Sequence, residues 1–216
     1  MPAILEELNA FIKEYNSSNE TGFAIDSIRI DFSKQHKLEE LQKIGQWKKI
    51  GKHSNILHKL IKRLHGEEFT SAHRLTGHDI YYYSLQDPPK YRRARMVIFG
   101  LSQYHKAPTP ESIVKRVLHV LKDVTNIDVC IDFDRPPNLE TLGQYFTLSH
   151  YQTSTFINRP LLPMVERIIF YDKQLKNALS TPLWRMEAMV TVPNWKVLAL
   201  PLRELNEVAA IAWGQT

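Results

Sequence analysis

The chain has 216 residues, 43% of them hydrophobic and 24% charged, and this ordinary globular composition excludes wholesale disorder. Its single cysteine, Cys130, excludes a disulfide framework and a cysteine-rich zinc module, and suits a reducing compartment. No apolar run approaches the roughly 20 residues that span a bilayer, and the amphipathic, acid-bearing N-terminus is unlike a secretory signal. We therefore expect a soluble cytoplasmic protein that folds as a single domain over residues 1–216.

The first two elements differ in their apolar periodicity. Residues 3–15 have apolar side chains at helical spacing, which predicts a helix. Residues 23–32 alternate between apolar and polar side chains, which predicts a half-buried strand with Arg29 and Asp31 on its polar side.

A basic segment follows this strand. From Lys34 to His65 there are nine Lys or Arg residues against two Glu, so the net charge of +5 is concentrated here. Two apolar stripes predict one or two helices with a break near Gly45 and Gly51. A basic patch on a nearly neutral chain indicates a nucleic-acid partner, although a solvated helix face has the same pattern. We expect residues 34–66 to form a basic helical DNA-binding segment, with phosphate contacts from Lys48, Lys49, Lys52, Lys59, Lys62 and Arg63.

The next elements resemble a β-hairpin. The runs 78–85 and 92–101 are strand-like, and Asp87-Pro88-Pro89 between them is a turn signal. Tyrosines that stack on bases and arginines that hold the backbone would suit single-stranded DNA, although aromatic residues also favour strands for packing alone. The residues that we expect to contact single-stranded DNA are Tyr82, Arg92, Arg93 and Arg95.

The second half of the chain predicts a helix after Pro108, strands over 127–134, 167–173 and 183–192, and a last helix over 202–213. Residues 138–163 are harder to assign, with a short helix near 139–146 and a loop or an edge strand. Because strands and helices do not alternate regularly, we predict an α+β fold with a largely antiparallel sheet, helices on one face and a basic helical segment near the N-terminus.

Strand periodicity gathers polar side chains on the other face of this sheet. Asp132 and Asp134 share a face of the first strand, Tyr171 and Lys173 a face of the second, and Glu187 lies on the third. Clustered carboxylates predict a divalent cation, and a cation beside a phenol is suited to phosphodiester transesterification. Arg185 shares the polar side of the third strand with Glu187, so the alternative is an open, solvated sheet face held by ion pairs such as Arg185–Glu187.

These strands also resemble a known family. The motifs CIDFD (130–134), RIIFYDK (167–173) and LWRMEAMV (183–190) are similar, in order and spacing, to those of rolling-circle replication initiators of filamentous-phage replication protein II/X type and staphylococcal-plasmid type. The resemblance implies an endonuclease that nicks one strand of a double-stranded origin and joins DNA. It implies that the 5′ phosphate stays on a tyrosine and that the cofactor is Mg²⁺ or Mn²⁺.

The roles of individual residues follow from the polar face and this resemblance together. We expect Tyr171 to be the nucleophile, with Tyr145, Tyr151 and Tyr82 as rivals, and Lys173 to hold the scissile phosphate or stabilise the phenolate. The expected metal ligands are Asp132, Asp134 and Glu187.

A second interpretation is a DNA-binding accessory factor without catalysis. The chain has no His-x-His triplet, which is the metal motif of the wider relaxase superfamily, and it is shorter than most initiators. Such a factor would regulate replication or stimulate a host recombinase. On either interpretation the expected partners are double-stranded origin DNA and single-stranded DNA, with a host helicase or recombinase as a further candidate.

Overall fold

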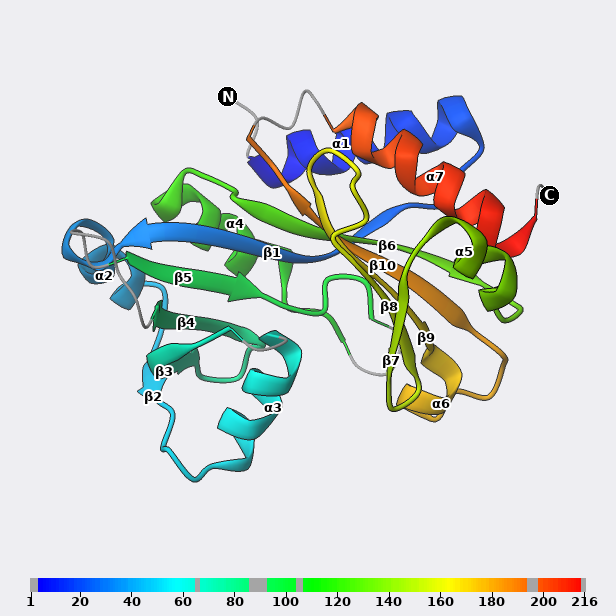
Figure 1. The fold of residues 1–216 in the computed structure, drawn as a ribbon. Helices are drawn as coiled ribbons and strands as arrows, with labels where there is room; N and C mark the ends of the chain where they lie inside the picture. Colours follow the sequence, from blue (N-terminus) through cyan, green and yellow to red (C-terminus); the bar gives the residue numbers. More distant parts are fainter. Residues whose placement is uncertain (1–3, 65–66, 86–92, 104–106, 194–197, 215–216) are drawn as a thin grey trace. The chain divides into compact units, whose positions relative to one another are not determined.

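The structure is a computed structural model that describes residues 4–64, 67–85, 93–103, 107–193 and 198–214. The chain forms two compact units whose segments alternate along the sequence (Figure 1). Unit 1 consists of Met1–Glu7, Ser27–Leu101 and Pro108–Thr125, and unit 2 consists of Leu8–Asp26, Ser102–Ala107 and Asn126–Thr216. Both units contain antiparallel strands and helices, which confirms the α+β class, while the assignment of residues 1–216 to a single domain stays a prediction.

Unit 1 contains five antiparallel strands in the order β2-β3-β4-β5-β1. The strands are β1 (Ala24–Ser33), β2 (Trp47–Lys49), β3 (Phe69–Leu75), β4 (Ile80–Leu85) and β5 (Arg93–Ile98). The first three residues of β1, which end at Asp26, belong to unit 2. The helices are α2 (Lys34–Gln42), α3 (Asn55–Leu64) and α4 (Glu111–Leu121). Strands β4 and β5 pair as the expected hairpin, and the turn predicted at Asp87-Pro88-Pro89 lies outside the described residues.

The basic segment is not wholly helical. Helices α2 and α3 occupy its two apolar stripes, and the short strand β2 occupies the break between them. Two contacts explain the break: the Trp47 indole donates a hydrogen bond to the Leu41 carbonyl at 2.9 Å, and Gly45 lies so close to Leu75 that a Cβ there would come within 2.9 Å of it. As a result Lys48 and Lys49 lie on an edge strand, where lysine discourages further strand pairing.

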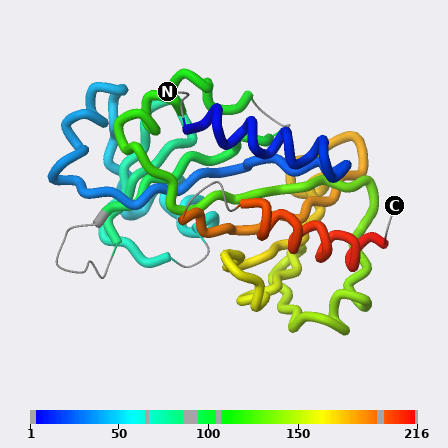
Figure 2. The backbone as a smooth tube through the Cα atoms, turned by 90° about the horizontal axis from the view of Figure 1, so that it is seen from above, coloured from blue at the N-terminus to red at the C-terminus, as the bar shows by residue number. Residues whose placement is uncertain are grey.

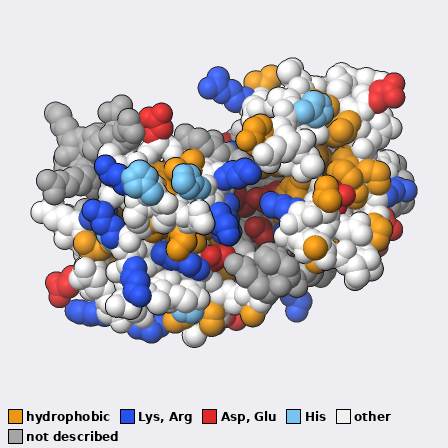
Figure 3. Space-filling model, turned by 90° about the horizontal axis from the view of Figure 1, so that it is seen from below, with side chains coloured by type: hydrophobic (Ala, Val, Ile, Leu, Met, Phe, Trp, Pro, Cys, Tyr) orange, Lys and Arg blue, Asp and Glu red, His pale blue; other side chains and the backbone are white. Residues whose placement is uncertain are grey.

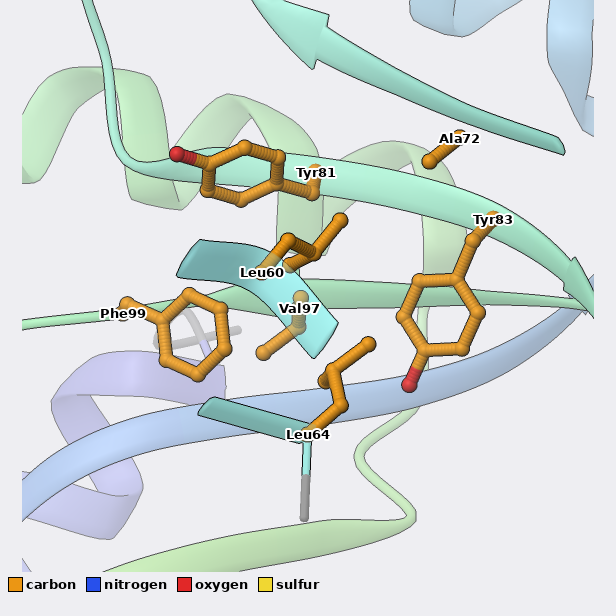
Figure 4. Packing of buried hydrophobic residues seen from close by; sticks show 7 residues of the cluster. All are labelled: Leu60, Leu64, Ala72, Tyr81, Tyr83, Val97 and Phe99. Atoms are coloured by element: carbon orange, nitrogen blue, oxygen red, sulfur yellow. The ribbon is translucent and has the colours of Figure 1, made fainter. Parts of the chain in front are cut away.

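Helix α3 packs on one face of the unit 1 strands. Leu60 and Leu64 are buried against Tyr81, Val97 and Phe99 (Figure 4). Burial of a leucine side chain contributes about 1.5–3 kcal/mol, so these contacts hold the helix more firmly than its polar residues do.

Unit 2 contains five antiparallel strands in the order β6-β10-β9-β8-β7. The strands are β6 (Asn126–Phe133), β7 (Leu148–Tyr151), β8 (Ser154–Asn158), β9 (Val165–Asp172) and β10 (Trp184–Thr191). The helices are α5 (Leu139–Tyr145), α6 (Lys173–Asn177) and α7 (Ala199–Trp213), together with most of α1 (Ile4–Asn19). Residues 138–163, which were hard to assign from sequence, form α5 and the β7–β8 hairpin.

Helices α1 and α7 lie on the same face of the unit 2 strands (Figures 1 and 2). Helix α7 contacts β10 and α5, and Leu202, Leu205 and Val208 supply its buried side. The opposite face of β6, β10 and β9 is left for the polar side chains that the sequence predicted. None of the helices among the described residues is long and apolar enough to cross a membrane.

Candidate functional site

The polar face of unit 2 is organised around Arg185, which is 1% exposed. The strand register places Arg185 opposite Asp132 on one side and Tyr171 on the other. Its Nε and Nη2 donate to Oδ1 and Oδ2 of Asp132 at 2.6 and 2.7 Å. Its Nη1 donates to Oδ1 of Asp26 at 2.8 Å and to the Ser102 carbonyl at 3.1 Å. One guanidinium therefore serves two carboxylates from distant parts of the sequence.

Tyr171 and Glu187 form a second contact on this face. The Tyr171 hydroxyl donates to Oε2 of Glu187 at 3.0 Å, and the tyrosine is 6% exposed. Burial and the neighbouring Glu187 carboxylate raise the pKa of Tyr171 well above its ordinary value, because both disfavour the negatively charged phenolate. In this structure Tyr171 is a neutral, buried hydrogen-bond donor.

The Glu187 carboxyl is itself perturbed. Burial, followed by repulsion from Asp26 and Asp128, raises the pKa of Glu187 to about 7. A carboxyl with this pKa is partly protonated near neutral pH, so it can take up or release a proton under ordinary conditions.

Lys173 does not lie on the strand as expected. Strand β9 ends at Asp172, whose side chain accepts a hydrogen bond from the Leu175 amide at 2.8 Å, and Lys173 begins helix α6. This is a typical helix N-cap, which ends the strand one residue early. The buried Lys173 ammonium donates to the Ser102 carbonyl at 3.2 Å. Burial and then repulsion from Arg185 lower the pKa of Lys173.

The expected metal ligands do not converge in this structure. Asp132 is held by Arg185, Glu187 accepts a hydrogen bond from Tyr171, and the exposed Asp134 follows the last residue of β6. Among the described residues, no group of three or more His, Cys, Asp or Glu side chains is placed to hold a metal ion. These side chains do not form a ready cation site, so the use of Mg²⁺ or Mn²⁺ stays a prediction.

The other candidate tyrosines have contrasting surroundings. Tyr145, at the end of α5, is 65% exposed, and Tyr151, at the end of β7, is 61% exposed. Tyr145 lies on the wall of a pocket of about 510 Å³ that Arg135 and Trp213 also line. Cys130 is buried, and burial raises the pKa of its thiol, so it remains protonated.

The hairpin tyrosines point into unit 1 and do not present their rings to solvent. Tyr82 is 4% exposed, stacks on His73 with ring centroids 4.5 Å apart, and packs against Trp47 at 5.0 Å. A base has no free face of Tyr82 to stack on, so the structure supports the packing alternative for this residue.

The hairpin arginines are only partly described. Arg95 donates to Asp31 at 2.7 Å and to Glu67 at 2.8 Å, so its charge is neutralised inside unit 1. Arg92 and the side chain of Arg93 lie outside what the structure describes.

The basic segment, in contrast, presents its lysines to solvent. Lys, Arg and His side chains gather over unit 1 on the face shown in Figure 3. Arg63 is used differently from the lysines, because its guanidinium pairs with Asp79 at 3.3 Å and lies 3.7 Å from the centre of the Phe99 ring. The lysines with exposed side chains are Lys48, Lys49, Lys52, Lys59 and Lys62.

Sequence reasoning missed two partners of Arg185. It placed Arg29 and Asp31 on the polar side of β1, but Asp31 pairs with Arg95 in unit 1 and Asp26 is the residue that reaches Arg185. In β1 the buried residues are Ile25 and Ser27 in the first part and Ile28, Ile30 and Phe32 in the second, so the alternation changes phase after Ser27, and Arg29 is buried as well. Strict alternation therefore gave the wrong face for its first residues. The contact made by the Ser102 carbonyl has no sequence signal, because any residue has a carbonyl.

Comparisons with known proteins do not identify the family of this chain. No family model matches the chain, and no curated protein matches its sequence. Among solved structures, the chain is similar to one described as the rolling circle replication initiator protein from Geobacillus stearothermophilus, with 14% identity over 87% of this chain and 82% of that chain and a TM-score of 0.43. A likeness at this level of identity and TM-score does not assign a function to the chain.

Proposed function

We propose that this chain is a DNA-binding replication protein of a phage, a plasmid or a related mobile element, and that it acts at a replication origin. The observation that supports DNA binding is the set of exposed lysines on β2, the loop after it and α3. The replication role rests on the three sequence motifs in residues 130–134, 167–173 and 183–190. Expected partners are double-stranded origin DNA and single-stranded DNA, and a host helicase or recombinase.

The lysines are free to act on a partner. Within the part of the chain that the structure describes, none of Lys48, Lys49, Lys52, Lys59 and Lys62 forms an ion pair. Unneutralised lysines repel one another and contribute little to stability. When they bind DNA they displace counterions from its phosphates, and the release of these counterions favours binding. The segment is therefore better suited to a polyanion than to the interior of its own unit.

The salt dependence of DNA affinity tests this proposal. We expect replacement of Lys48, Lys49, Lys59 and Lys62 by Glu to flatten the slope of log K against log salt by about 3–4 units, since each phosphate contact adds roughly 0.9. Fluorescence anisotropy with a labelled duplex measures the slope. Two single charge reversals form a matched control pair. Lys59→Glu changes a lysine of the basic segment, and Lys13→Glu changes an exposed helical lysine of unit 2. Equal slopes for that pair and an unchanged slope for the quadruple variant would place the DNA surface elsewhere.

DNA nicking and joining is the second candidate function, and the Tyr171–Glu187 hydrogen bond is the observation that favours it. In this reaction the Tyr171 oxygen forms a bond to phosphorus, the bond from phosphorus to the 3′ oxygen breaks, and the 5′ phosphate stays on the tyrosine. Glu187, with a pKa of about 7, would accept the phenol proton. The leaving 3′ oxygen would take a proton from water, and Lys173 would contact the scissile phosphate. Because Tyr171 is buried, it must first become accessible to DNA.

A nicking assay separates an enzyme from an accessory factor. Supercoiled DNA is incubated with the protein and Mn²⁺, and relaxed circles and covalently attached protein are measured. We expect Tyr171→Phe to lose the adduct while it keeps its fold and its DNA affinity, because the ring still packs. Tyr145→Phe, Tyr151→Phe and Tyr82→Phe are the controls, and loss of the adduct in one of them would transfer the role. No adduct with the wild type would favour an accessory factor that regulates replication or stimulates a host recombinase.

A further inference from the structure

Helix α3 has two chemically distinct sides. Leu60 and Leu64 face the core of unit 1 and are buried there (Figure 4). The opposite side is formed by exposed residues at i, i+3, i+4 and i+7, a spacing that places them along one face of a helix. These residues are Asn55, His58, Lys59 and Lys62. The outward face of α3 thus contains hydrogen-bond donors and cations and no acid.

The helix is fixed near both ends. The Ser54 hydroxyl accepts a hydrogen bond from the Leu57 amide at 3.2 Å, which caps the first turn. Near the last turn, Arg63 pairs with Asp79 and packs on the Phe99 ring. A side chain that distinguishes bases must be held by a rigid element, and these contacts provide one.

The dimensions and chemistry of this face match the major groove of duplex DNA. A ten-residue helix is about 15 Å long and 10–12 Å wide, and the major groove is about 12 Å wide. Asparagine suits the N6 and N7 positions of adenine, and lysine suits the O6 and N7 positions of guanine. Lys48, Lys49 and Lys52 precede the helix and can contact phosphates beside it.

We propose that α3 reads duplex sequence from the major groove through Asn55, His58, Lys59 and Lys62. This inference rests on the proposed DNA binding and deepens it from charge attraction to base recognition. Two observations favour duplex DNA over other polyanions. Helix α3 contains no Phe, Tyr or Trp on which an unpaired base could stack. Leu60 and Leu64 are buried in unit 1, and the exposed Ile56 and Ile61 lie five positions apart, on opposite flanks of the polar side, so they form no single apolar stripe that could insert into an anionic membrane.

Selection from a library of duplex oligonucleotides with a random central segment tests the proposal. We expect the full-length wild type to enrich one sequence motif. Asn55→Ala should lose about 5- to 100-fold of the preference at one base pair, the range that a bidentate base contact supplies. Its affinity for random duplex should stay within about 2-fold, because no phosphate contact is lost. Gln42→Ala removes another exposed amide, from α2 of the same unit, and should leave the motif intact.

A chemical substitution in the DNA identifies the groove. In the enriched duplex, 7-deazaadenine removes the N7 acceptor from the major groove and leaves every phosphate in place. We expect it to weaken wild-type binding and to have little further effect on Asn55→Ala. Circular dichroism confirms that each variant is folded.

The outcomes separate this inference from the proposed function. No enriched motif, or a motif that Asn55→Ala and 7-deazaadenine leave unchanged, would overturn base reading while salt-dependent DNA binding stands. Absence of duplex binding would overturn both. Tighter binding to phosphatidylglycerol vesicles than to duplex would assign the basic face to a membrane and would also overturn both.

Discussion

Replacing Arg185 by methionine removes the cation at the centre of the polar face and keeps much of the side-chain volume. Arg185 is 1% exposed and donates to both oxygens of Asp132 and to Asp26. Loss of one partner from a buried ion pair costs about 3–5 kcal/mol, because the remaining carboxylate keeps its desolvation penalty. We therefore expect the free energy of unfolding at pH 7 to fall by about 3–5 kcal/mol.

Urea unfolding followed by tryptophan fluorescence measures this loss. Trp213 reports on unit 2, because its ring is buried and stacks on Phe133 with centroids 3.8 Å apart. The double variant Arg185→Met/Asp132→Asn should recover part of the stability, since it also removes the charge that is left alone. A loss below about 1 kcal/mol in Arg185→Met, or a double variant no more stable than the single one, would refute the view that Arg185 neutralises this face.

Three further predictions concern the same face. The pKa of Glu187 is about 7 in the folded protein, above its ordinary 4.5, so the free energy of unfolding should fall by up to about 3 kcal/mol as the pH rises from 4.5 to 7. Urea unfolding across this range should show the decrease in the wild type, and Glu187→Gln should remove it. The buried, protonated Cys130 thiol should react with a thiol reagent only after unfolding, whereas rapid labelling of the native protein would contradict its placement. If Asp132, Asp134 and Glu187 hold a cation together, calorimetric titration with Mn²⁺ should give a binding heat that Asp132→Asn lacks, and equal heats would argue against the site.

The sequence predicted which strands carry the polar face. Alternation in 127–134, 167–173 and 183–192 placed Asp132, Tyr171 and Arg185 on polar sides, and the strand register brings these three together. Period-2 patterns predict such faces well, because one side of each strand must be buried. The same reasoning found the β4–β5 hairpin from two strand-like runs around a turn signal.

Pairing partners were harder to predict, because they depend on contacts between distant segments. The sequence suggested an Arg185–Glu187 ion pair as the alternative to a metal site. In the structure Arg185 instead binds Asp132 and Asp26. Glu187 accepts a hydrogen bond from Tyr171. The role of the three consecutive tyrosines, Tyr81, Tyr82 and Tyr83, was ambiguous for another reason. Strand β4 lies between β3 and β5 and is buried on both faces, so aromatic residues fill it regardless of any ligand.

The two candidate functions differ in what must happen to the polar face when DNA arrives. Nicking requires the Tyr171 oxygen to reach phosphorus, so this buried hydroxyl must become exposed. A phosphate is also a bidentate acceptor for arginine and can replace Asp132 on the Arg185 guanidinium. Such an exchange would free the Asp132 carboxylate for the role of metal ligand that the sequence predicts for it. An accessory factor requires no such exchange. Its lysines would bind DNA while Arg185 keeps Asp132 and Asp26 neutralised, and the polar face would only stabilise unit 2.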